Sequence, residues 1–412
     1  MHVLMLTMGS AGDMLPFVGL GAELQRRGHR VTLAGNGHFR EFADQESLGF
    51  LDLVSADEYR REVLERKDWS WRSSGRFGLR RCAEKLEPAY RIVSEAVQQE
   101  PQTVVLAHVW VLGARIARDK HRFPLFTCHL QPSTLLPSDR AVRELGWRRR
   151  VRMAVANFVT DRMIGGPVNE FRRKVGLPPV QRVMQEWFHG PEGVFGVFPE
   201  WFGTMRPHEL PQFRYLGFSR YDQRKEAGPQ PELEEYLRAG EPPIVFSSPS
   251  FIPNGPSYRT VCLETAKRLH QRAIFLGQAA DTSAPRTDHA ADFAYVPLSQ
   301  LLSRCRAHVH HGGMGTLAAT LAAGIPQIAI PAVSDQPDNA RRLAETGVAR
   351  VIPRKGLTVD RLEQSLNEVL TSADVKAACV KYAELVLAQD PFVVGADRIE
   401  AVAQNFFADA AV

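Results

Sequence analysis

The stretch AHVHHGGMGTLAATLAAGIPQIAIPAV, residues 307–333, decides the fold class of this 412-residue chain. It predicts a short apolar strand over 307–310, a glycine-rich turn, a helix, and a second apolar strand that starts near residue 327. Strands that are apolar throughout are typical of a parallel sheet covered by helices on both faces. The stretch therefore predicts part of a doubly wound α/β sheet, in which ligands bind beyond the carboxyl ends of the strands.

The same alternation of strand and helix extends outward in both directions and predicts two Rossmann-like domains that face a cleft. The polar stretch SRYDQRKEAGPQPE, which is rich in glycine and proline, separates two series of apolar runs. We predict an N-terminal domain over 1–220, a linker over 221–235 and a C-terminal domain over 236–390. Residues 391–412 are predicted to form a helix that packs back on the N-terminal domain.

Composition excludes several classes of protein. The 51 basic and 46 acidic residues give a net charge of +5 that is spread along the chain, so no nucleic-acid partner is expected. The five cysteines form no C-x-x-C pair, which indicates reduced thiols rather than a zinc site or a disulfide framework. The chain starts with a strand pattern rather than a signal peptide, and no apolar run is long enough for a bilayer. We therefore expect a soluble cytoplasmic protein.

The glycine-rich turn is typical of a site for a phosphate group. Glycines between a strand and a helix allow an anion to reach the N–H groups at the start of the helix. Here the turn contains His311, Gly313, Gly315 and Thr316, and both His311 and the Thr316 hydroxyl could donate to a diphosphate. The turn matches neither the P-loop nor the G-x-G-x-x-G pattern. Because neighbouring histidines on a strand point in opposite directions and no Asp-x-Asp occurs, we expect no metal.

Two further sites carry carboxylates after predicted strands. Asp335 and Gln336 follow the strand near residue 327, where such a pair could hydrogen-bond to vicinal hydroxyls of a sugar. Asp13 follows the first strand in the small-residue stretch GSAGDMLP. Each aspartate could instead cap the helix after it, so the residues alone leave both interpretations open.

Several of these motifs resemble those of the GT-B nucleotide-sugar glycosyltransferases, a superfamily that includes plant UDP-glucosyltransferases and bacterial macrolide, glycopeptide and sterol glycosyltransferases. The matching stretches are HHGGMGT (310–316), SDQPDN (334–339), YVPLSQLL (295–302) and VFSSPSF (245–251). The resemblance covers nearly the whole chain and implies an acceptor-binding N-terminal domain and a donor-binding C-terminal domain. Within the superfamily the sequence is most similar to rhamnosyltransferase subunits of bacterial rhamnolipid synthesis, through stretches such as GSAGDMLPFVGL and GVFGVFPEWF.

The resemblance implies roles for individual residues of the donor site. His311 falls at the histidine that binds the donor diphosphate, and Asp335 and Gln336 fall at the pair that holds the donor sugar. Residues of the YVPLSQLL and VFSSPSF segments would contact the base and the diphosphate; they are Tyr295, Val296, Leu298 and Ser250. Pro249 stands where glycine is common, which is a departure from the pattern.

On the acceptor side, the resemblance implies that Asp13 is the catalytic base. Many members carry a histidine in a G-H-x-x-P loop after the first strand, and this chain has Asp13 in that position. A carboxylate near an acceptor hydroxyl can remove its proton and needs no second carboxylate to orient it. Consistent with this, Ala107 stands where the aspartate that orients the histidine usually lies. His108, Trp110 and His129 are the other acceptor-side candidates.

The choice of donor is predicted from one helical position. Plant members carry a glutamate that accepts from the ribose hydroxyls, whereas this chain has Ala319 there. A dTDP-sugar lacks the 2′-hydroxyl and needs that acceptor less. We therefore predict an inverting, metal-independent transfer of a hexose, L-rhamnose from dTDP-L-rhamnose, onto a hydroxyl of a lipophilic acceptor such as a hydroxyacyl lipid. The nucleotide sugar is a co-substrate, and no cofactor is expected.

Three alternatives remain open at this point. The enzyme could transfer glucose from UDP-glucose to a sterol, polyketide or flavonoid. The chain could also be a silent nucleotide-sugar-binding subunit, although the presence of Asp13, Asp335 and Gln336 argues against that. An epimerase on the same fold would release no nucleoside diphosphate in an acceptor-dependent way.

The segment GWRRRVRMAVANFV, residues 146–159, contains the basic cluster of the chain, formed by Arg148, Arg149, Arg150 and Arg152. One interpretation is a surface helix with solvated arginines. The other is a peripheral contact with the inner face of the membrane or with an anionic lipid acceptor. The sequence does not decide between them, and it does not indicate the oligomeric state.

Overall fold

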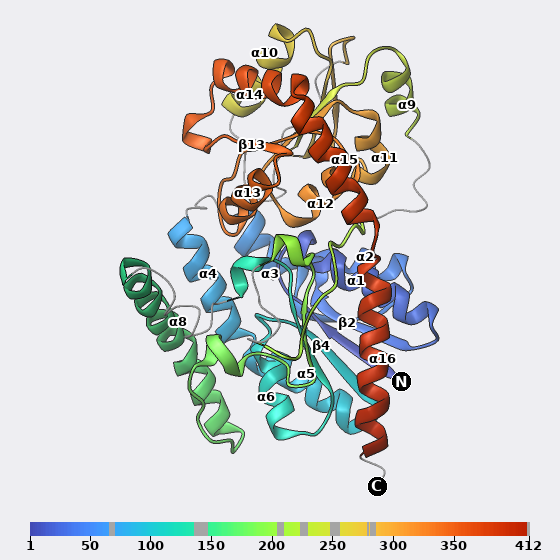
Figure 1. Cartoon of the computed structure of the whole chain (residues 1–412). Coiled ribbons are helices and arrows are strands. Elements are labelled where there is room, and N and C mark those ends of the chain that lie inside the picture. The colour runs from blue at the N-terminus through green and yellow to red at the C-terminus, as the bar shows by residue number, and fades with distance from the viewer. Residues whose placement is uncertain are drawn as a thin grey trace. The chain divides into compact units, whose positions relative to one another are not determined.

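The computed structural model describes residues 1–65, 71–135, 147–203, 210–222, 230–247, 256–277, 280 and 286–409. The chain divides into two compact units (Figure 1). Unit 1 consists of Met1–Ser219 together with Asp390–Val412, and unit 2 consists of Arg220–Gln389. The end of the chain therefore belongs to the same unit as its beginning.

Unit 1 contains a seven-stranded parallel sheet with the strand order β3-β2-β1-β4-β5-β6-β7. The strands are β1 His2–Leu6, β2 Arg30–Asn36, β3 Gly49–Val54, β4 Thr103–His108, β5 Leu125–His129, β6 Gly193–Gly196 and β7 Phe213–Tyr215. Strands β1, β4 and β5 are buried along their whole length because helices cover the sheet on both faces. The strand order changes direction between β1 and β4, which is where ligands bind in such sheets.

The helices of unit 1 connect these strands as right-handed crossovers require. The α-helices are α1 Ala11–Arg26, α2 Arg40–Gln45, α3 Ala56–Tyr59, α4 Trp71–Glu84, α5 Leu86–Gln99, α6 Leu112–Lys120, α8 Trp147–Lys174 and α16 Pro391–Asp409. Shorter helical turns are η1 Gly37–Phe39, η2 Arg60–Leu64, η3 Pro132–Thr134, η4 Val183–Trp187 and η5 Glu200–Phe202. An apolar cluster between the sheet and helices α5 and α6 forms one part of the core.

Unit 2 contains a six-stranded parallel sheet with the order β10-β9-β8-β11-β12-β13, which reverses between β8 and β11. The strands are β8 Ile244–Ser247, β9 Ala273–Leu276, β10 Ala290–Phe293, β11 Ala307–His310, β12 Gln327–Ala329 and β13 Ala349–Val351. The helices are α9 Pro231–Arg238, α10 Pro256–Arg268, α11 Leu298–Leu301, α12 Met314–Ala322, α13 Gln336–Glu345, α14 Val359–Thr371 and α15 Ala373–Leu387, with turns η7 Leu302–Arg304 and η8 Arg354–Gly356.

The predicted fold class, two doubly wound α/β domains, is confirmed by these two parallel sheets. Strand β13, at the edge of the second sheet, was not predicted because Arg350 interrupts its short apolar run. Within the predicted linker 221–235, helix α9 begins at Pro231 and residues 223–229 lie outside the described part of the chain. That the two domains share a cleft stays a prediction.

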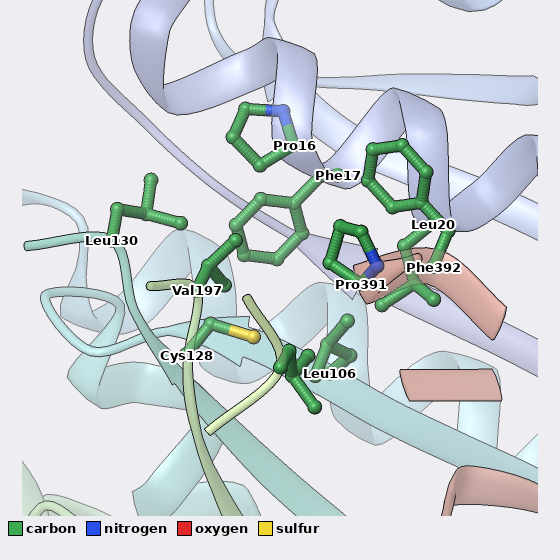
Figure 2. Close-up of a pocket in the computed structure, with 10 residues that line it drawn as sticks. Pro16, Phe17, Leu20, Leu106, Cys128, Leu130, Val197, Pro391 and Phe392 are labelled. Atoms are coloured by element: carbon green, nitrogen blue, oxygen red, sulfur yellow. The ribbon is translucent and has the colours of Figure 1, made fainter. Parts of the chain in front are cut away.

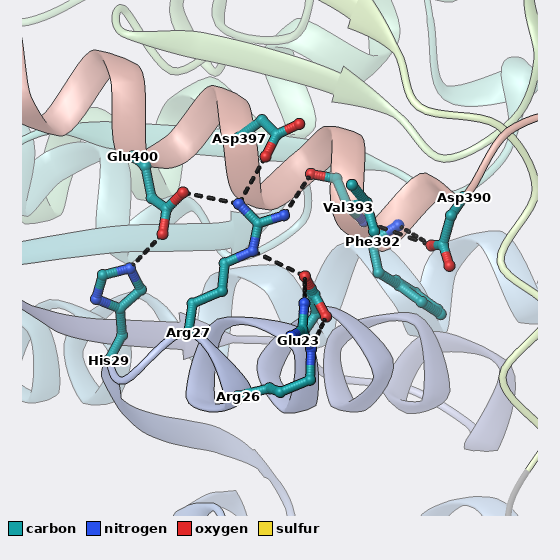
Figure 3. A network of polar contacts seen from close by, with 9 residues as sticks. All are labelled: Glu23, Arg26, Arg27, His29, Asp390, Phe392, Val393, Asp397 and Glu400. Atoms are coloured by element: carbon teal, nitrogen blue, oxygen red, sulfur yellow. Dashed lines mark hydrogen bonds and ion pairs between the residues drawn. The ribbon is translucent and has the colours of Figure 1, made fainter.

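Helix α16 is fixed to helix α1 by charged side chains. Arg27 donates to Glu23 on α1 and to Asp397 and Glu400 on α16, and His29 contacts Glu400 at 2.7 Å (Figure 3). The Arg27 side chain is 17 % exposed, so these pairs are better shielded from solvent than ordinary surface pairs. The last helix of the chain is thereby a structural part of unit 1.

A membrane-spanning helix is not found among the described residues. None of the helices in that part of the chain combines the length and the hydropathy that crossing a bilayer requires.

Candidate functional site

In unit 2 the glycine-rich turn lies where the strand order reverses, directly after β11. Gly312 has a φ of +86°, a conformation that favours glycine, and Gly313 is the N-cap of α12. A Cβ at Gly315 would meet no atom within 4 Å, so the first turn of α12 is uncovered on that side. Thr316 is the third residue of α12 and is partly buried. The turn therefore leaves room for an anion at the N–H groups of the helix.

His311 lies against this turn as a neutral imidazole. Its Nε2 is 2.5 Å from where a Cβ at Gly313 would stand, so Gly313 is needed for the ring to fit. Its Nδ1 is buried and has no hydrogen-bond partner within the described residues. Burial, and next the neighbouring His310, lower the pKa of His311 to about 3. His311 can therefore donate a hydrogen bond to a phosphate from the N–H of a neutral imidazole.

Asp335 and Gln336 lie at the start of α13, close to the same turn. Asp335 occupies the N-cap position but makes no side-chain capping bond, so the helix-capping interpretation does not explain its carboxylate. The carboxylate accepts a hydrogen bond from Asn339 Nδ2 at 2.6 Å, while burial raises the pKa of Asp335. Asn339 Nδ2 also donates to the carbonyl of Gly312 at 3.1 Å. The predicted sugar-binding carboxylate is thus joined to the predicted diphosphate turn.

The side chain of Gln336 is oriented differently from what was expected of a group that hydrogen-bonds to sugar hydroxyls. Its side chain is 3 % exposed, and its Oε1 accepts from the backbone N–H groups of Ala332 and Val333 at 2.9 and 3.2 Å. The amide oxygen therefore fixes the loop that precedes α13. Only the amide nitrogen can contribute to a sugar site, because a sequence pattern does not show which way an amide side chain points.

Of the three residues predicted to contact the base, Tyr295 is the exposed one. Val296 is 3 % exposed within the core of unit 2, and Leu298 packs against the same core, so Val296 can offer little beyond its backbone. Tyr295 is 42 % exposed, and its hydroxyl donates to the carbonyl of Asp222. Ser250 and Pro249 lie outside the described residues.

In unit 1, Asp13 is the third residue of α1 rather than part of a loop. Its Oδ2 accepts from the backbone N–H of Ser10 at 2.8 Å and from the Ser10 hydroxyl at 3.1 Å, which makes a capping box. Gly9 has a φ of +132°, and a Cβ there would lie 2.2 Å from Asp13 Oδ2. Gly9 is therefore needed because the Asp13 carboxylate folds back over it.

The other acceptor-side candidates lie deeper in unit 1. His108 is 2 % exposed, neither ring nitrogen has a partner among the described residues, and burial lowers its pKa to about 3. His129 is fully buried, contacts Thr134 Oγ1 at 2.7 Å, and has a pKa well below its usual value for the same reason. Trp110 packs against an apolar cluster, and Ala107 is buried in the core. Both histidine rings are buried, whereas Asp13 is partly exposed, so Asp13 is more accessible to a ligand than either histidine.

His189 was not predicted as a site residue, although it lies beside His129. The centroids of the two rings are 5.3 Å apart, and both ring nitrogens of His189 are buried without a partner within the described residues. His189 is 60 residues further along the chain, in the loop after η4, which is joined to β5 by the hydrogen bond from the Gly190 N–H to Thr127 Oγ1; no local pattern indicates this contact.

A small apolar pocket lies beside α1 in unit 1 (Figure 2). Its lining residues are Pro16, Phe17, Leu20, Leu106, Cys128, Leu130, Val197, Leu216, Pro391 and Phe392. Pro16 and Phe17 come three and four residues after Asp13, which places them on the same side of the helix. The pocket therefore lies on the Asp13 side of α1.

A metal centre is not found in the part of the chain that the structure describes, where no three or more His, Cys, Asp or Glu side chains are grouped to hold an ion.

Comparison with known proteins gives one family match in each half of the chain. Residues 3–136 match the glycosyltransferase family 28 N-terminal domain, and residues 279–400 match the C-terminal domain of erythromycin biosynthesis protein CIII-like proteins. The chain is 28 % identical to O-mycaminosyltylonolide 6-deoxyallosyltransferase of Streptomyces fradiae, over 94 % of both chains. It is 27 % identical to sterol 3-beta-glucosyltransferase UGT80A2 of Arabidopsis thaliana, covering 92 % of this chain and 63 % of that one.

Among solved structures, the spinosyn rhamnosyltransferase SpnG is similar with a TM-score of 0.70 at 18 % identity, over 96 % of this chain and 98 % of that one. SpnG has also been solved with thymidine diphosphate bound. Likeness at this level of identity shows a common fold. The two domain matches and the two parallel sheets together establish that the chain belongs to the GT-B glycosyltransferase superfamily, with a family 28 N-terminal domain and an EryCIII-like C-terminal domain.

Proposed function

We propose that this glycosyltransferase transfers L-rhamnose from dTDP-L-rhamnose to a hydroxyl of a lipophilic acceptor, with inversion at the anomeric carbon. The observation that carries the proposal is the arrangement in unit 2. There the uncovered turn at Gly315, neutral His311 and the Asp335 carboxylate lie beyond the carboxyl ends of the strands β11 and β12. These groups are chemically suited to a diphosphate and to sugar hydroxyls.

The chemistry assigns one role to each group. Asp13 takes the proton of the acceptor hydroxyl while the acceptor oxygen bonds to the anomeric carbon, on the face opposite the diphosphate. The bond between that carbon and the diphosphate oxygen breaks with its electron pair, and dTDP leaves. The His311 N–H and the N–H groups at the start of α12 stabilise the charge that develops on the diphosphate. The proposed step needs no metal for that purpose.

The preference for dTDP over UDP rests on Ala319. This residue lies on α12 and packs against the core of unit 2. An alanine cannot accept from a ribose 2′-hydroxyl, and a buried hydroxyl without a partner costs roughly 1–3 kcal/mol. The solved complex of SpnG with thymidine diphosphate supports the same choice, since SpnG is a rhamnosyltransferase of this fold.

A lipophilic acceptor is supported by the apolar pocket beside Asp13 and by the relatives. The pocket has aromatic and aliphatic walls, among them Phe17 and Phe392. The similar Arabidopsis protein is named for glucosyl transfer to a sterol, and the Streptomyces relative for deoxyallosyl transfer to a tylonolide. Transfer of glucose from UDP-glucose to a sterol is therefore the competing function. A hydroxyacyl lipid is proposed from the resemblance of the stretches GSAGDMLPFVGL and GVFGVFPEWF to rhamnolipid rhamnosyltransferases.

The proposal is tested by incubating the protein with dTDP-L-rhamnose, with and without a 3-hydroxyacyl lipid, and measuring released dTDP and glycolipid by mass spectrometry. Release of dTDP in equal amount to rhamnosylated lipid, and unchanged by EDTA, is the expected result. UDP-glucose with a sterol is assayed in parallel, and faster transfer there would replace the proposed donor and acceptor. Binding of dTDP-L-rhamnose without release, across all acceptors tried, would instead indicate a silent subunit.

A further inference from the structure

Asn339 connects the two loops that form the proposed donor site. It lies on α13 and is fully buried. Its Nδ2 donates one hydrogen to the Gly312 carbonyl in the loop after β11 and the other to Asp335 Oδ2 in the loop after β12. Because both of these atoms can only accept, they fix the orientation of the amide. One nitrogen atom therefore holds the diphosphate turn and the carboxylate together.

The opposite side of Gly312 is fixed by His310. The backbone N–H of Gly312 donates to His310 Nδ1 at 3.0 Å, so this nitrogen must be the acceptor of the ring. The proton is then on Nε2, which contacts Gln327 Oε1 at 2.8 Å. Gly312 is thus held at its N–H by a buried histidine and at its carbonyl by Asn339, and its φ of +86° is defined from both sides.

Packing alone does not account for Asn339. Its Oδ1 is buried and has no partner within the described residues. A buried acceptor without a partner is destabilising, so the two hydrogen bonds that the amide donates must offset this cost. Both hydrogen bonds that Asn339 donates go to groups of the proposed donor site rather than to the scaffold.

We propose that Asn339 is a positioning residue that makes the diphosphate turn and the sugar-binding carboxylate act as one unit. This inference rests on the proposed function, in which Gly312 shapes the diphosphate site and Asp335 binds the sugar. Without the Asn339 amide, the turn and the carboxylate are no longer joined by a shared donor, and Asp335 loses the side-chain hydrogen bond from α13 that helps to orient it. Both the diphosphate and the sugar should then bind more weakly, whereas loss of the Asp335 carboxylate alone should affect only the sugar.

The test is a double-mutant cycle with Asn339→Ala, Asp335→Ala and the double variant, using dissociation constants for dTDP and dTDP-L-rhamnose. The ratio of the two constants measures the contribution of the sugar. We expect Asn339→Ala to weaken dTDP about tenfold and to remove most of the sugar contribution. Asp335→Ala should leave the dissociation constant for dTDP within about twofold of the wild-type value. The double variant should lose no more of the sugar contribution than Asp335→Ala alone.

Asp338→Asn is the matched control, because Asp338 is on the same helix but its carboxylate pairs with Arg341 and Arg342. It should bind both ligands as the wild type does. Additive losses of the sugar contribution in the double variant, or unchanged dTDP binding by Asn339→Ala, would overturn the inference. Failure of the wild type to bind either dTDP or UDP would overturn the proposed function instead.

Asn339→Asp supplies a second measurement if the alanine variant does not fold. It places a second carboxyl against Asp335, and two such groups share a proton more readily as the pH falls. The other titratable groups nearby are Asp338, His310 and His311. We expect the sugar contribution of this variant to recover between pH 8 and pH 5.5 while that of the wild type stays flat. A flat profile in both proteins would contradict a positioning role.

Discussion

At the scale of single residues, Asp13 combines a structural and a proposed chemical role. Its Oδ2 closes the capping box with Ser10, and Gly9 leaves the space that the carboxylate occupies. The two interpretations that the sequence left open, a helix-capping carboxylate and a carboxylate that faces a ligand, are therefore compatible. An asparagine can retain the oxygen that accepts from Ser10 but cannot take a proton from an acceptor hydroxyl.

We therefore expect Asp13→Asn to fold and to bind dTDP normally, with turnover lowered on the order of 10²–10⁴-fold. Steady-state release of dTDP in the presence of acceptor measures the effect. The control is Asp44→Asn, which makes the same change at an exposed position of α2. Turnover of Asp13→Asn close to that of the wild type would rule out Asp13 as the base.

Residues of the donor site differ in how far the sequence could predict them. Gly313, His311 and Asp335 were placed from a local pattern, because a turn and a helix start are determined by neighbouring residues. The orientation of Gln336 and the partners of Asn339 depend on contacts between α13 and the loops after β11 and β12. Such contacts are made across the fold, so the sequence indicated the position of these residues but not their interactions.

At the scale of elements, α8 differs from the other helices in its exposed apolar side chains. Trp147 is 70 % exposed and Phe158 is 68 % exposed, and the helix bears further exposed apolar residues at Val151, Val155, Val159 and Met163. Four arginines lie in the same stretch of sequence, at 148–150 and 152. Figure 1 shows α8 at the edge of unit 1, where α4 and α5 contact one side of it. The helix was predictable from the sequence, but the exposure of these residues was not.

We propose that this helix binds an anionic membrane surface, and expect co-sedimentation of the protein with phosphatidylglycerol vesicles but not with phosphatidylcholine vesicles. Val155→Asp with Phe158→Asp should weaken binding at least tenfold, because two exposed apolar groups that the membrane would cover are lost and two negative charges are added. Val380→Asp with Leu387→Asp is the matched control, since both residues are exposed on α15. Equal effects of the two double variants, or no vesicle binding, would leave α8 a solvated surface helix.

At the scale of the whole molecule, both units contain buried histidines that remain neutral. Burial lowers the pKa of seven of them far below the usual value near 6.5; they are His2, His108, His129, His189, His308, His310 and His311. In the unfolded chain each takes up a proton below pH 6.5, whereas in the folded protein it does not. The unfolded state therefore binds more protons at acid pH, and stability is lost as the pH falls below about 6.5.

The free energy of unfolding should accordingly drop between pH 7 and pH 5, with each histidine contributing roughly 1 kcal/mol per pH unit below 6.5. Urea unfolding at several pH values measures this slope. His108→Leu, which replaces a histidine whose ring nitrogens have no partner in the described part of the chain, should make the slope shallower. A stability that is constant from pH 7 to pH 5 would contradict the neutral state of these side chains.

The two-sheet architecture was the feature most completely predictable from the sequence. Buried strands such as β1 and β4 are apolar throughout and are followed by helical patterns, so the doubly wound order follows from local sequence. The ion pairs between Arg27 and helix α16 were not predictable in detail, because they join residues more than 360 positions apart. A pattern can place a helix, but the surface against which it packs depends on the completed fold.

We propose that unit 2 binds the diphosphate of a dTDP-sugar through the turn after β11, with His311 as a donor. The most direct test is calorimetric titration of dTDP and UDP into the wild type, His311→Ala and Asp335→Ala at one salt concentration and pH. We predict that the wild type binds dTDP more tightly than UDP by about one to two decades. His311→Ala should bind dTDP poorly, and Asp335→Ala almost normally. Tighter binding of UDP, no binding of either nucleotide by the wild type, or equal losses in both variants would contradict the account.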